Sequence, residues 1–289
     1  MRLLLLFLVA LLLPFLGMAV AASIMTRPAR AVIGPPPADL PIETVSFRSG
    51  SGAMIRAWYL PGREGAGAVA LFHGVRSNRL AALPRMRFLN RAGYGVLAID
   101  FQAHGESEGD MITFGLRESF DAKAAIAWLR ERTKGPVAAM GASLGGAALL
   151  LGEEPPAVDA VVLEEVYPTI DDAVAHRLER RFGAPGRWIA PLYLSVGQMM
   201  TGIKASQLRP IDRVGRLTMP VFVMGGTLDT STPIEETRAL FAAVRGEREL
   251  WEVEGAGHFD LHAFVPAEYE RHVLDFLARM RTAALVNRA

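Results

Sequence analysis

The chain has no cysteine among its 289 residues. Disulfide bonds, thiol catalysis and cysteine-ligated metal centres are therefore excluded. It also lacks an excess of either charge, because 31 Lys and Arg residues stand against 30 Asp and Glu residues, a formal net charge of +1. No basic run with interleaved aromatic residues occurs, so nucleic acid is not expected as a partner. What remains is a globular composition, 51% hydrophobic, that suits one α/β domain.

Charge is also missing from the first 25 residues, apart from Arg2. The uncharged segment Leu3 to Met25 is long enough to span a bilayer. Pro14 and Gly17 would interrupt an apolar helix, and Ala19-Val20-Ala21 matches the small-x-small pattern of signal peptidase sites. Residues 1–25 are therefore predicted to be a signal peptide or a transmembrane anchor. We expect a retained anchor at the cell membrane, with an exported or periplasmic protein as the alternative.

Prolines are concentrated directly after this segment, at positions 28, 35, 36, 37 and 41. Prolines at this density stiffen a chain toward polyproline II and cannot continue a helix. Residues 26–41 are therefore predicted to form an extended stalk. The folded domain is expected to start at Ile42 and to cover residues 42–289.

Short apolar runs alternate with helical patterns over the rest of the chain. The segments 43–48 and 53–60 alternate in polarity and predict two half-buried strands. Six apolar runs predict further strands at 68–74, 95–101, 136–141, 160–165, 220–226 and 249–255. Helical patterns fall at roughly 78–92, 117–133, 144–152, 233–245 and 266–282. Continuous apolar strands are typical of parallel sheets, which are buried on both faces. The alternation predicts an α/β fold with one doubly wound, mostly parallel eight-stranded sheet.

A long helical stretch, residues 167–216, interrupts this rhythm between the sixth and seventh predicted strands. Connections of this length in a compact domain are commonly functional. We expect a helical insertion that forms a lid or a wall of the binding site. The alternative, which the sequence leaves open, is an additional packing layer that meets no ligand.

The segment GASLGG, residues 141–146, surrounds Ser143 with glycine, alanine and leucine. An apolar run precedes it and a helical pattern follows, which is the context of the nucleophile-elbow motif Gly-x-Ser-x-Gly. Gly141 and Gly145 are expected where a Cβ atom would collide with the neighbouring strand and helix. Ser143 would then stand at the carboxyl edge of the sheet, where a helix N-terminus favours developing negative charge. The alternative is simple close packing of helix on strand.

A serine hydroxyl needs a base and an orienting acid to act as a nucleophile. Asp229 follows the seventh predicted strand, and His258 follows the eighth among glycines. The order Ser, Asp, His is the order of the motif's fold class. Open α/β sheets also place their sites at the carboxyl ends of strands. We expect His258 as the general base and Asp229 as its orienter, although Asp229 could instead cap the helix that follows.

The oxyanion of an acyl transfer needs two N–H donors. We expect them to be the backbone N–H groups of Leu144, directly after the nucleophile, and of Val75, in the loop after ALFHG. His73, in the same loop, is expected to brace it through hydrogen bonds rather than to take part in catalysis.

The segment DFQAHGESEG, residues 100–109, contains side chains that could be taken for metal ligands. They are Asp100, His104 and Glu106. Their spacing matches no zinc pattern such as His-Glu-x-x-His, and no second histidine accompanies them. We therefore predict a structured loop that shapes the site, and no metal site.

With these motifs the sequence resembles the α/β-hydrolase superfamily over nearly all of residues 42–282. The resemblance is carried, in the family's order, by LFHGVRSN, GVLAIDFQAHGESEG, GASLGG, GGTLDTSTP and EGAGHFD. Together with the apolar segment over residues 1–25, the chain looks like a member of a membrane-anchored subgroup. That subgroup is similar to serine aminopeptidase-like hydrolases, dienelactone hydrolases and acyl-protein thioesterases. The resemblance implies Ser143 as nucleophile, Asp229 as acid, His258 as base and no cofactor.

The function expected from the sequence is that of a membrane-targeted serine hydrolase. It would cleave an ester, thioester or amide bond of a small-molecule or acylated substrate through an acyl-enzyme. One alternative is a non-catalytic binding module with the same fold, whose usual mark, a lost triad residue, is absent here. A second is different chemistry, as in haloperoxidases or epoxide hydrolases; the latter carry aspartate at the nucleophile position, where this chain has Ser143. The fold hosts many substrates, so the acyl group, leaving group and oligomeric state stay open.

Overall fold

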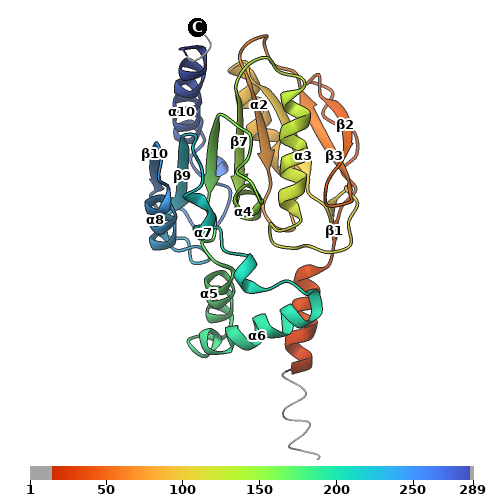
Figure 1. The fold of residues 1–289 in the computed structure, drawn as a ribbon, viewed down its shortest axis with the longest axis vertical. Helices are drawn as coiled ribbons and strands as arrows, with labels where there is room; N and C mark the ends of the chain where they lie inside the picture. Colours follow the sequence, from red (N-terminus) through yellow and green to blue (C-terminus); the bar gives the residue numbers. More distant parts are fainter. Residues whose placement is uncertain (1–14, 287–289) are drawn as a thin grey trace, which may run out of the picture.

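In a computed structural model, which describes residues 15–286, an eight-stranded sheet is covered by helices on both faces (Figure 1). Its spatial order is β10-β9-β8-β7-β4-β5-β3-β2. Within this sheet the pairs β2–β3 and β3–β5 are antiparallel, and the other pairs are parallel. The strands are β2 (Glu43–Arg48), β3 (Met54–Leu60), β4 (Ala68–Phe72), β5 (Gly95–Asp100), β7 (Val137–Ala142), β8 (Ala160–Glu164), β9 (Val221–Gly226) and β10 (Arg248–Val253). The predicted α/β fold and mostly parallel eight-stranded sheet are confirmed.

Alternate residues of the central strands point into two separate hydrophobic cores. In β4, Ala68, Ala70 and Phe72 pack on one side, whereas Val69 and Leu71 pack on the other. Every residue of β4 is buried. Successive side chains of a strand point to opposite faces, so a strand between two helical layers must be apolar throughout. Each buried Val, Leu or Phe side chain contributes about 1.5–3 kcal/mol to this packing.

The predicted helices are present and divide between the two faces of the sheet (Figure 1). On one face lie α3 (Glu118–Arg130) and α4 (Leu144–Leu151), and on the other lie α2 (Leu83–Arg91) and α10 (Pro266–Val286). The remaining elements of this part are η1 (Arg79–Ala82), β6 (His104–Gly105), α8 (Ile234–Ala243) and α9 (Leu261–Phe264).

The insertion between β8 and β9 is helical, as predicted. It consists of α5 (Ile170–Phe182), α6 (Pro185–Thr201), η2 (Ala205–Gln207) and α7 (Ile211–Val214). Thr169 caps α5, because its side chain accepts a hydrogen bond from the Asp172 N–H group. Gly183 ends α5 with a φ of +71°, a conformation that glycine adopts readily. Figure 1 shows α5 and α6 below the sheet, next to the N-terminal helical segment formed by residues 15–26.

The proline-rich segment lies on the domain instead of standing away from it. β1 (Ala29–Arg30) pairs in parallel with β6. The Glu106 side chain accepts hydrogen bonds from the Ile33 and Gly34 N–H groups. The prediction of a separate stalk over residues 26–41, with the domain starting at Ile42, is therefore wrong. The prolines do keep this segment free of helix, but the groups that it pairs with lie about 75 residues away, where a local pattern cannot indicate them.

The predicted membrane segment is only partly described. Residues 15–26 are helical, whereas residues 1–14 lie outside the described part of the chain. Within residues 15–286, no helix combines the length and the apolar character needed to cross a bilayer.

Candidate active site

Ser143 occupies a one-residue turn between β7 and α4. Its backbone has φ +49° and ψ −111°, which residues with a side chain rarely adopt. Such a conformation costs about 1–3 kcal/mol and is typical of functional sites. Two hydrogen bonds hold it: the Ser143 N–H group donates to the Glu164 carbonyl at 2.8 Å, and its carbonyl accepts from the Ala147 N–H group at 3.0 Å. The turn therefore presents the serine hydroxyl at the carboxyl edge of the sheet.

The glycines around Ser143 are there because the turn leaves no room for a Cβ atom. A Cβ on Gly141 would lie closer than 3.0 Å to the backbone of Gly145. A Cβ on Gly145 would overlap the Phe72 carbonyl in β4, and one on Gly146 would overlap the Val166 side chain. The expectation that Gly141 and Gly145 avoid collisions is confirmed, so the segment GASLGG serves close packing and the sharp turn together.

Asp229 and His258 lie side by side at the same edge of the sheet. The His258 Nδ1 atom is 2.7 Å from the Asp229 Oδ2 atom. The other oxygen of Asp229, Oδ1, accepts hydrogen bonds from the Ser231 and Thr232 N–H groups at 2.6 and 2.9 Å. The Asp229 carboxylate is thus fixed by three donors, and a neutral His258 that donates from Nδ1 leaves its Nε2 atom free to accept a proton.

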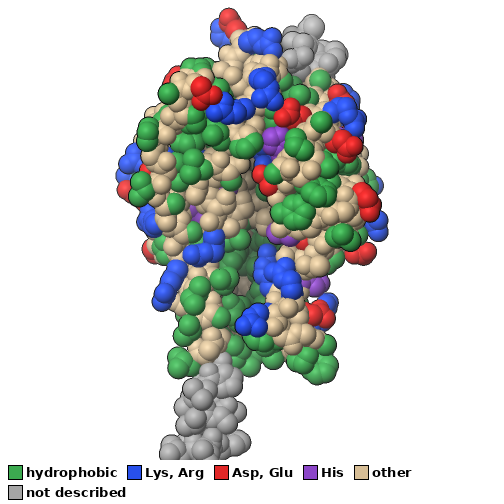
Figure 2. Space-filling model, turned by 180° about the vertical axis from the view of Figure 1, so that it is seen from behind, with side chains coloured by type: hydrophobic (Ala, Val, Ile, Leu, Met, Phe, Trp, Pro, Cys, Tyr) green, Lys and Arg blue, Asp and Glu red, His purple; other side chains and the backbone are tan. Residues whose placement is uncertain are grey.

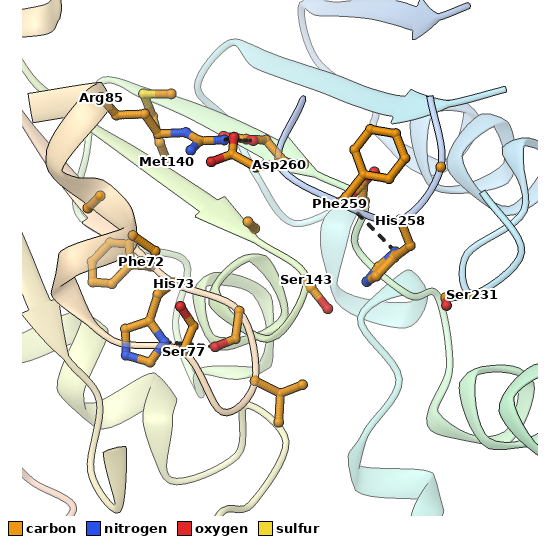
Figure 3. Close-up of a pocket in the computed structure, with 18 of the residues that line it drawn as sticks. Phe72, His73, Ser77, Arg85, Met140, Ser143, Ser231, His258, Phe259 and Asp260 are labelled. Atoms are coloured by element: carbon orange, nitrogen blue, oxygen red, sulfur yellow. Dashed lines mark hydrogen bonds and ion pairs between the residues drawn. The ribbon is translucent and has the colours of Figure 1, made fainter. Parts of the chain in front are cut away.

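A cavity of about 600 Å³ lies at this edge of the sheet. Ser143 and His258 both line it, and Figure 3 shows their side chains pointing into the same space. Within the described residues, the Ser143 hydroxyl makes no hydrogen bond. Catalytic hydrogen bonds are often long in ligand-free enzymes and shorten when substrate binds.

The two expected oxyanion donors lie at this cavity or directly beside it. Val75 lines the cavity, and Leu144 is the first residue of α4. Neither N–H group donates to an acceptor in the part of the chain that the structure describes. His73 braces the Val75 loop as predicted: its ring contacts the Gly74 carbonyl through Nδ1 at 2.8 Å, and its Nε2 atom accepts from the Phe101 N–H group at 3.1 Å. Burial lowers the pKa of His73 to about 3, so its ring is neutral.

The loop over residues 100–109 is held by an arginine that the sequence reading did not single out. Arg79 is buried and forms ion pairs with Asp100 and Glu106. The His104 ring contacts the Gln102 carbonyl through Nδ1 at 2.9 Å. Both carboxylates are therefore occupied by one guanidinium, and the predicted structured loop is confirmed.

Glu165 is a further acid beside the His258–Asp229 pair that the sequence reading missed. It directly follows β8, has a φ of +49°, and places Oε2 3.8 Å from the His258 Nδ1 atom. Burial, and then the negative charge of Asp229, raise the pKa of Glu165 to about 9. Glu165 is therefore a neutral acid at pH 7. Its only signal in the sequence was a glutamate at the end of an apolar strand.

Glu165, Asp229 and His258 offer ligand atoms within 4.8 Å of one another, the arrangement in residues 15–286 with metal-ligand spacing. A metal ion would require a charged Glu165 and would have to displace the hydrogen bond between Asp229 and His258. The protonation of Glu165 and the short contact between the other two residues favour an acid–base set over a metal site.

A network of charged residues around Arg85 lines another part of the cavity. Arg85 forms ion pairs with Glu164 at 2.8 Å and with Asp260 at 3.0 Å. The Tyr269 hydroxyl donates to Glu164 at 2.6 Å. Figure 3 shows the side chains of Arg85 and Asp260 next to each other. These residues come from distant parts of the chain, so no local motif could reveal the network.

Known proteins resemble this chain in sequence and structure. The model of the X-Pro dipeptidyl-peptidase family (S15) matches residues 54–188. YqkD of Bacillus subtilis is 23% identical over 237 residues, which cover 80% of this chain and 78% of that protein. The human protein ABHD12B is 26% identical over 210 residues, covering 65% of this chain and 53% of its own length.

Two esterase structures share the fold over most of the chain. The esterase Pf2001 of Pyrococcus furiosus has a TM-score of 0.72 and 25% identity, covering 88% of this chain and 98% of that one. An esterase from Exiguobacterium antarcticum has a TM-score of 0.62 and 16% identity, covering 82% and 100%. The chain therefore has the α/β-hydrolase fold, and these likenesses support its place in the α/β-hydrolase superfamily as a hydrolase.

Proposed function

We propose that the protein is a serine hydrolase that cleaves a carboxylic ester through an acyl-enzyme. One observation carries the proposal: the strained turn at Ser143 opens into the same cavity as His258, whose imidazole is held by Asp229 at 2.7 Å. A nucleophile, a base and an orienting acid with these positions make up the machinery of acyl transfer.

In the proposed reaction, His258 takes the proton of the Ser143 hydroxyl while its oxygen attacks the ester carbonyl. The N–H groups of Val75 and Leu144 stabilise the oxyanion, and the N-terminus of α4 adds a favourable dipole. His258 then gives its proton to the departing alcohol. Water, deprotonated by His258, releases the carboxylic acid and restores Ser143. Asp229 stabilises the charged imidazole in both steps.

The walls of the cavity favour an ester over a peptide with a free amino terminus. Arg85, Arg177 and Arg180 line it. Its carboxylates are not free to bind an ammonium group, because Glu164 and Asp260 are paired with Arg85 and Glu165 is protonated. The match to the S15 family covers Ser143 but ends before Asp229. Peptidase or thioesterase activity is therefore the second choice.

Covalent labelling tests this function. The full chain should react with a fluorophosphonate probe, and Ser143→Ala should abolish the labelling while leaving the circular dichroism spectrum unchanged. Ser46→Ala, which removes an exposed hydroxyl in β2, is the matched control and should label like the wild type. Equal labelling of the Ser143→Ala variant, or none of the wild type, would contradict the proposal and would favour a binding module.

We also propose that residues 1–25 remain attached as an anchor at the cell membrane. The support comes from the helical segment, which is tied to the domain next to the oxyanion loop. The Arg76 guanidinium donates to the carbonyls of Ile24 and Arg27, and the Thr26 carbonyl accepts from the Ile112 N–H group at 2.8 Å. The intact mass of the mature protein tests this: a chain that begins at Ala22 would mean a cleaved signal peptide.

A further inference from the structure

A second cavity, of about 450 Å³, adjoins the first and shares Ser143 with it. Ser143 and Leu144 form one part of its wall, and α5, α6 and residues 21–26 contribute much of the remainder. Its volume lies within the roughly 300–1,000 Å³ of pockets that hold a whole small ligand. Most of its lining is aliphatic or aromatic, and it includes Phe114, Ile170, Val174, Leu194, Ile203 and Leu208.

Helix α6 contributes one continuous face to this cavity. Tyr193, Gly197 and Thr201 line it and are spaced four residues apart, so they lie above one another on the same side of the helix. A Cβ atom added at Gly197 would meet nothing within 4 Å. The cavity is therefore widened beside the last turn of α6 by the absence of a side chain.

The opposite wall is the N-terminal helical segment. Ala22 is buried there, whereas Ile24 and Met25 line the cavity and are also exposed. Phe182, at the end of α5, also lines the cavity and has 56% of its surface exposed. Because these lining residues reach solvent, the cavity opens at the surface between the N-terminal segment and the insertion.

The surface around this opening is unusually apolar. Trp188 is 80% exposed and Met199 is 75% exposed. Large exposed hydrophobic residues of the two segments are Phe15, Leu16, Val20, Ile24, Met25, Phe182, Trp188, Ile189, Leu192, Met199 and Met200. Figure 2 shows a hollow lined with hydrophobic side chains, with Lys and Arg side chains on both sides. Exposed apolar groups flanked by basic residues are typical of surfaces that lie on anionic membranes.

We propose that the second cavity binds the acyl chain of a membrane-lipid ester, and that the apolar surface around its opening faces the bilayer. This substrate class rests on the serine-hydrolase function proposed above. The carbonyl carbon lies at Ser143, the acyl chain extends between α6 and the N-terminal segment, and the alcohol portion occupies the first cavity. The alcohol leaves with the proton from His258, and water then releases the fatty acid.

The acyl-chain preference of the full chain tests the cavity. Monomeric p-nitrophenyl esters from acetate to decanoate should show a kcat/KM that rises by up to about fourfold for each buried methylene. Gly197→Phe should fill the cavity. For this variant we expect a kcat/KM for the acetate ester within about threefold of the wild-type value. The kcat/KM for the decanoate ester should fall at least about 30-fold, because several methylenes can no longer be buried.

Ser195→Phe is the matched control, because it adds the same ring to the exposed side of α6. It should keep the wild-type chain-length preference. A Gly197→Phe variant that hydrolyses decanoate normally, or loses acetate and decanoate equally while still labelling at Ser143, would overturn the acyl-chain assignment. A wild-type enzyme that prefers acetate would do the same. Failure of all esters together with failure of fluorophosphonate labelling would instead contradict the serine-hydrolase function.

Whether the substrate comes from a bilayer is tested with the full chain, reconstituted into vesicles of phosphatidylglycerol and phosphatidylcholine. Trp188→Gln combined with Met199→Gln should slow hydrolysis of vesicle lipid at least about tenfold, because two buried apolar contacts with the bilayer are lost. Hydrolysis of dissolved decanoate should stay unchanged. Equal activity of variant and wild type on vesicle lipid, or no vesicle-lipid hydrolysis by a wild type that cleaves decanoate, would overturn the membrane source.

Discussion

The carboxyl edge of the sheet and the helical end of the molecule build one site in different ways. At the sheet edge, single residues lie in the turns and loops after strands: Ser143 after β7, Asp229 after β9 and His258 after β10. At the helical end, α5, α6 and residues 15–26 contribute whole faces, and no one residue defines the second cavity. The comparison teaches that the chemistry is encoded at points, whereas the proposed acyl-chain recognition is encoded in surfaces. Single substitutions should therefore have large effects on turnover at the sheet edge, and smaller, graded effects on substrate preference at the helical end.

The largest expected effect comes from Asp229. Asp229→Asn should lower kcat by about 10⁴-fold, since the amide favours the wrong tautomer of the histidine that it orients. The change preserves size, and melting temperature should confirm that the domain is folded. Ester turnover by the purified variant is the measurement. A loss of less than tenfold would mean that Glu165, not Asp229, orients His258.

The chemistry of the sheet edge was readable from the sequence because each residue has a local signal. Alternating polarity indicated β2 and β3, apolar runs indicated the other six strands of the large sheet, and the glycines beside Ser143 indicated the sharp turn. The buried arginines carried no such signal, since Arg79 and Arg85 meet their partners only in the folded chain. The proline-rich segment was misread for the same reason.

Arg79 tests whether the sheet edge depends on a buried ion cluster. Arg79→Met should destabilise the domain by about 3–5 kcal/mol, because Asp100 and Glu106 lose their shared partner and Asp100 stays buried. Urea denaturation measures the change. Arg48→Met, which removes an exposed ion pair with Glu108, is the control and should cost about 0–1 kcal/mol. Equal costs for the two variants would mean that the cluster does not hold the loop.

Gly186 tests how the packing of α6 on α5 affects the helical end of the molecule. A Cβ atom there would overlap the Leu178 backbone in α5, so Gly186→Ala should push α6 away from α5. We expect a destabilisation of about 1–3 kcal/mol. The kcat/KM for long-chain esters should fall by more than that for acetate. Kinetics on the two esters check this, and equal losses would show that α6 also holds the catalytic residues.

The smallest effect on activity is expected at Glu165. Glu165→Gln replaces a neutral acid with a neutral amide, so ester turnover at pH 7 should change by less than about threefold. Stability should respond more. The pKa of Glu165 is about 9 in the folded chain against 4.5 for the ordinary group, so the folded state keeps a proton that the unfolded state loses. Wild-type stability should therefore fall between pH 5 and pH 8 by at most about 1.4 kcal/mol per pH unit relative to the variant. Urea denaturation at several pH values measures this difference. If the stability of the wild type and of the variant changed with pH in the same way, the protonation of Glu165 would be contradicted.

The central claim, acyl transfer through Ser143, is tested most directly by trapping the intermediate. The full chain is mixed with p-nitrophenyl decanoate, quenched in acid during turnover, digested and analysed by mass spectrometry. The account predicts a decanoyl group on the Ser143 hydroxyl, present during turnover and absent after the substrate is consumed. Rapid ester turnover with no acylated peptide, or with the acyl group on another residue, would contradict it.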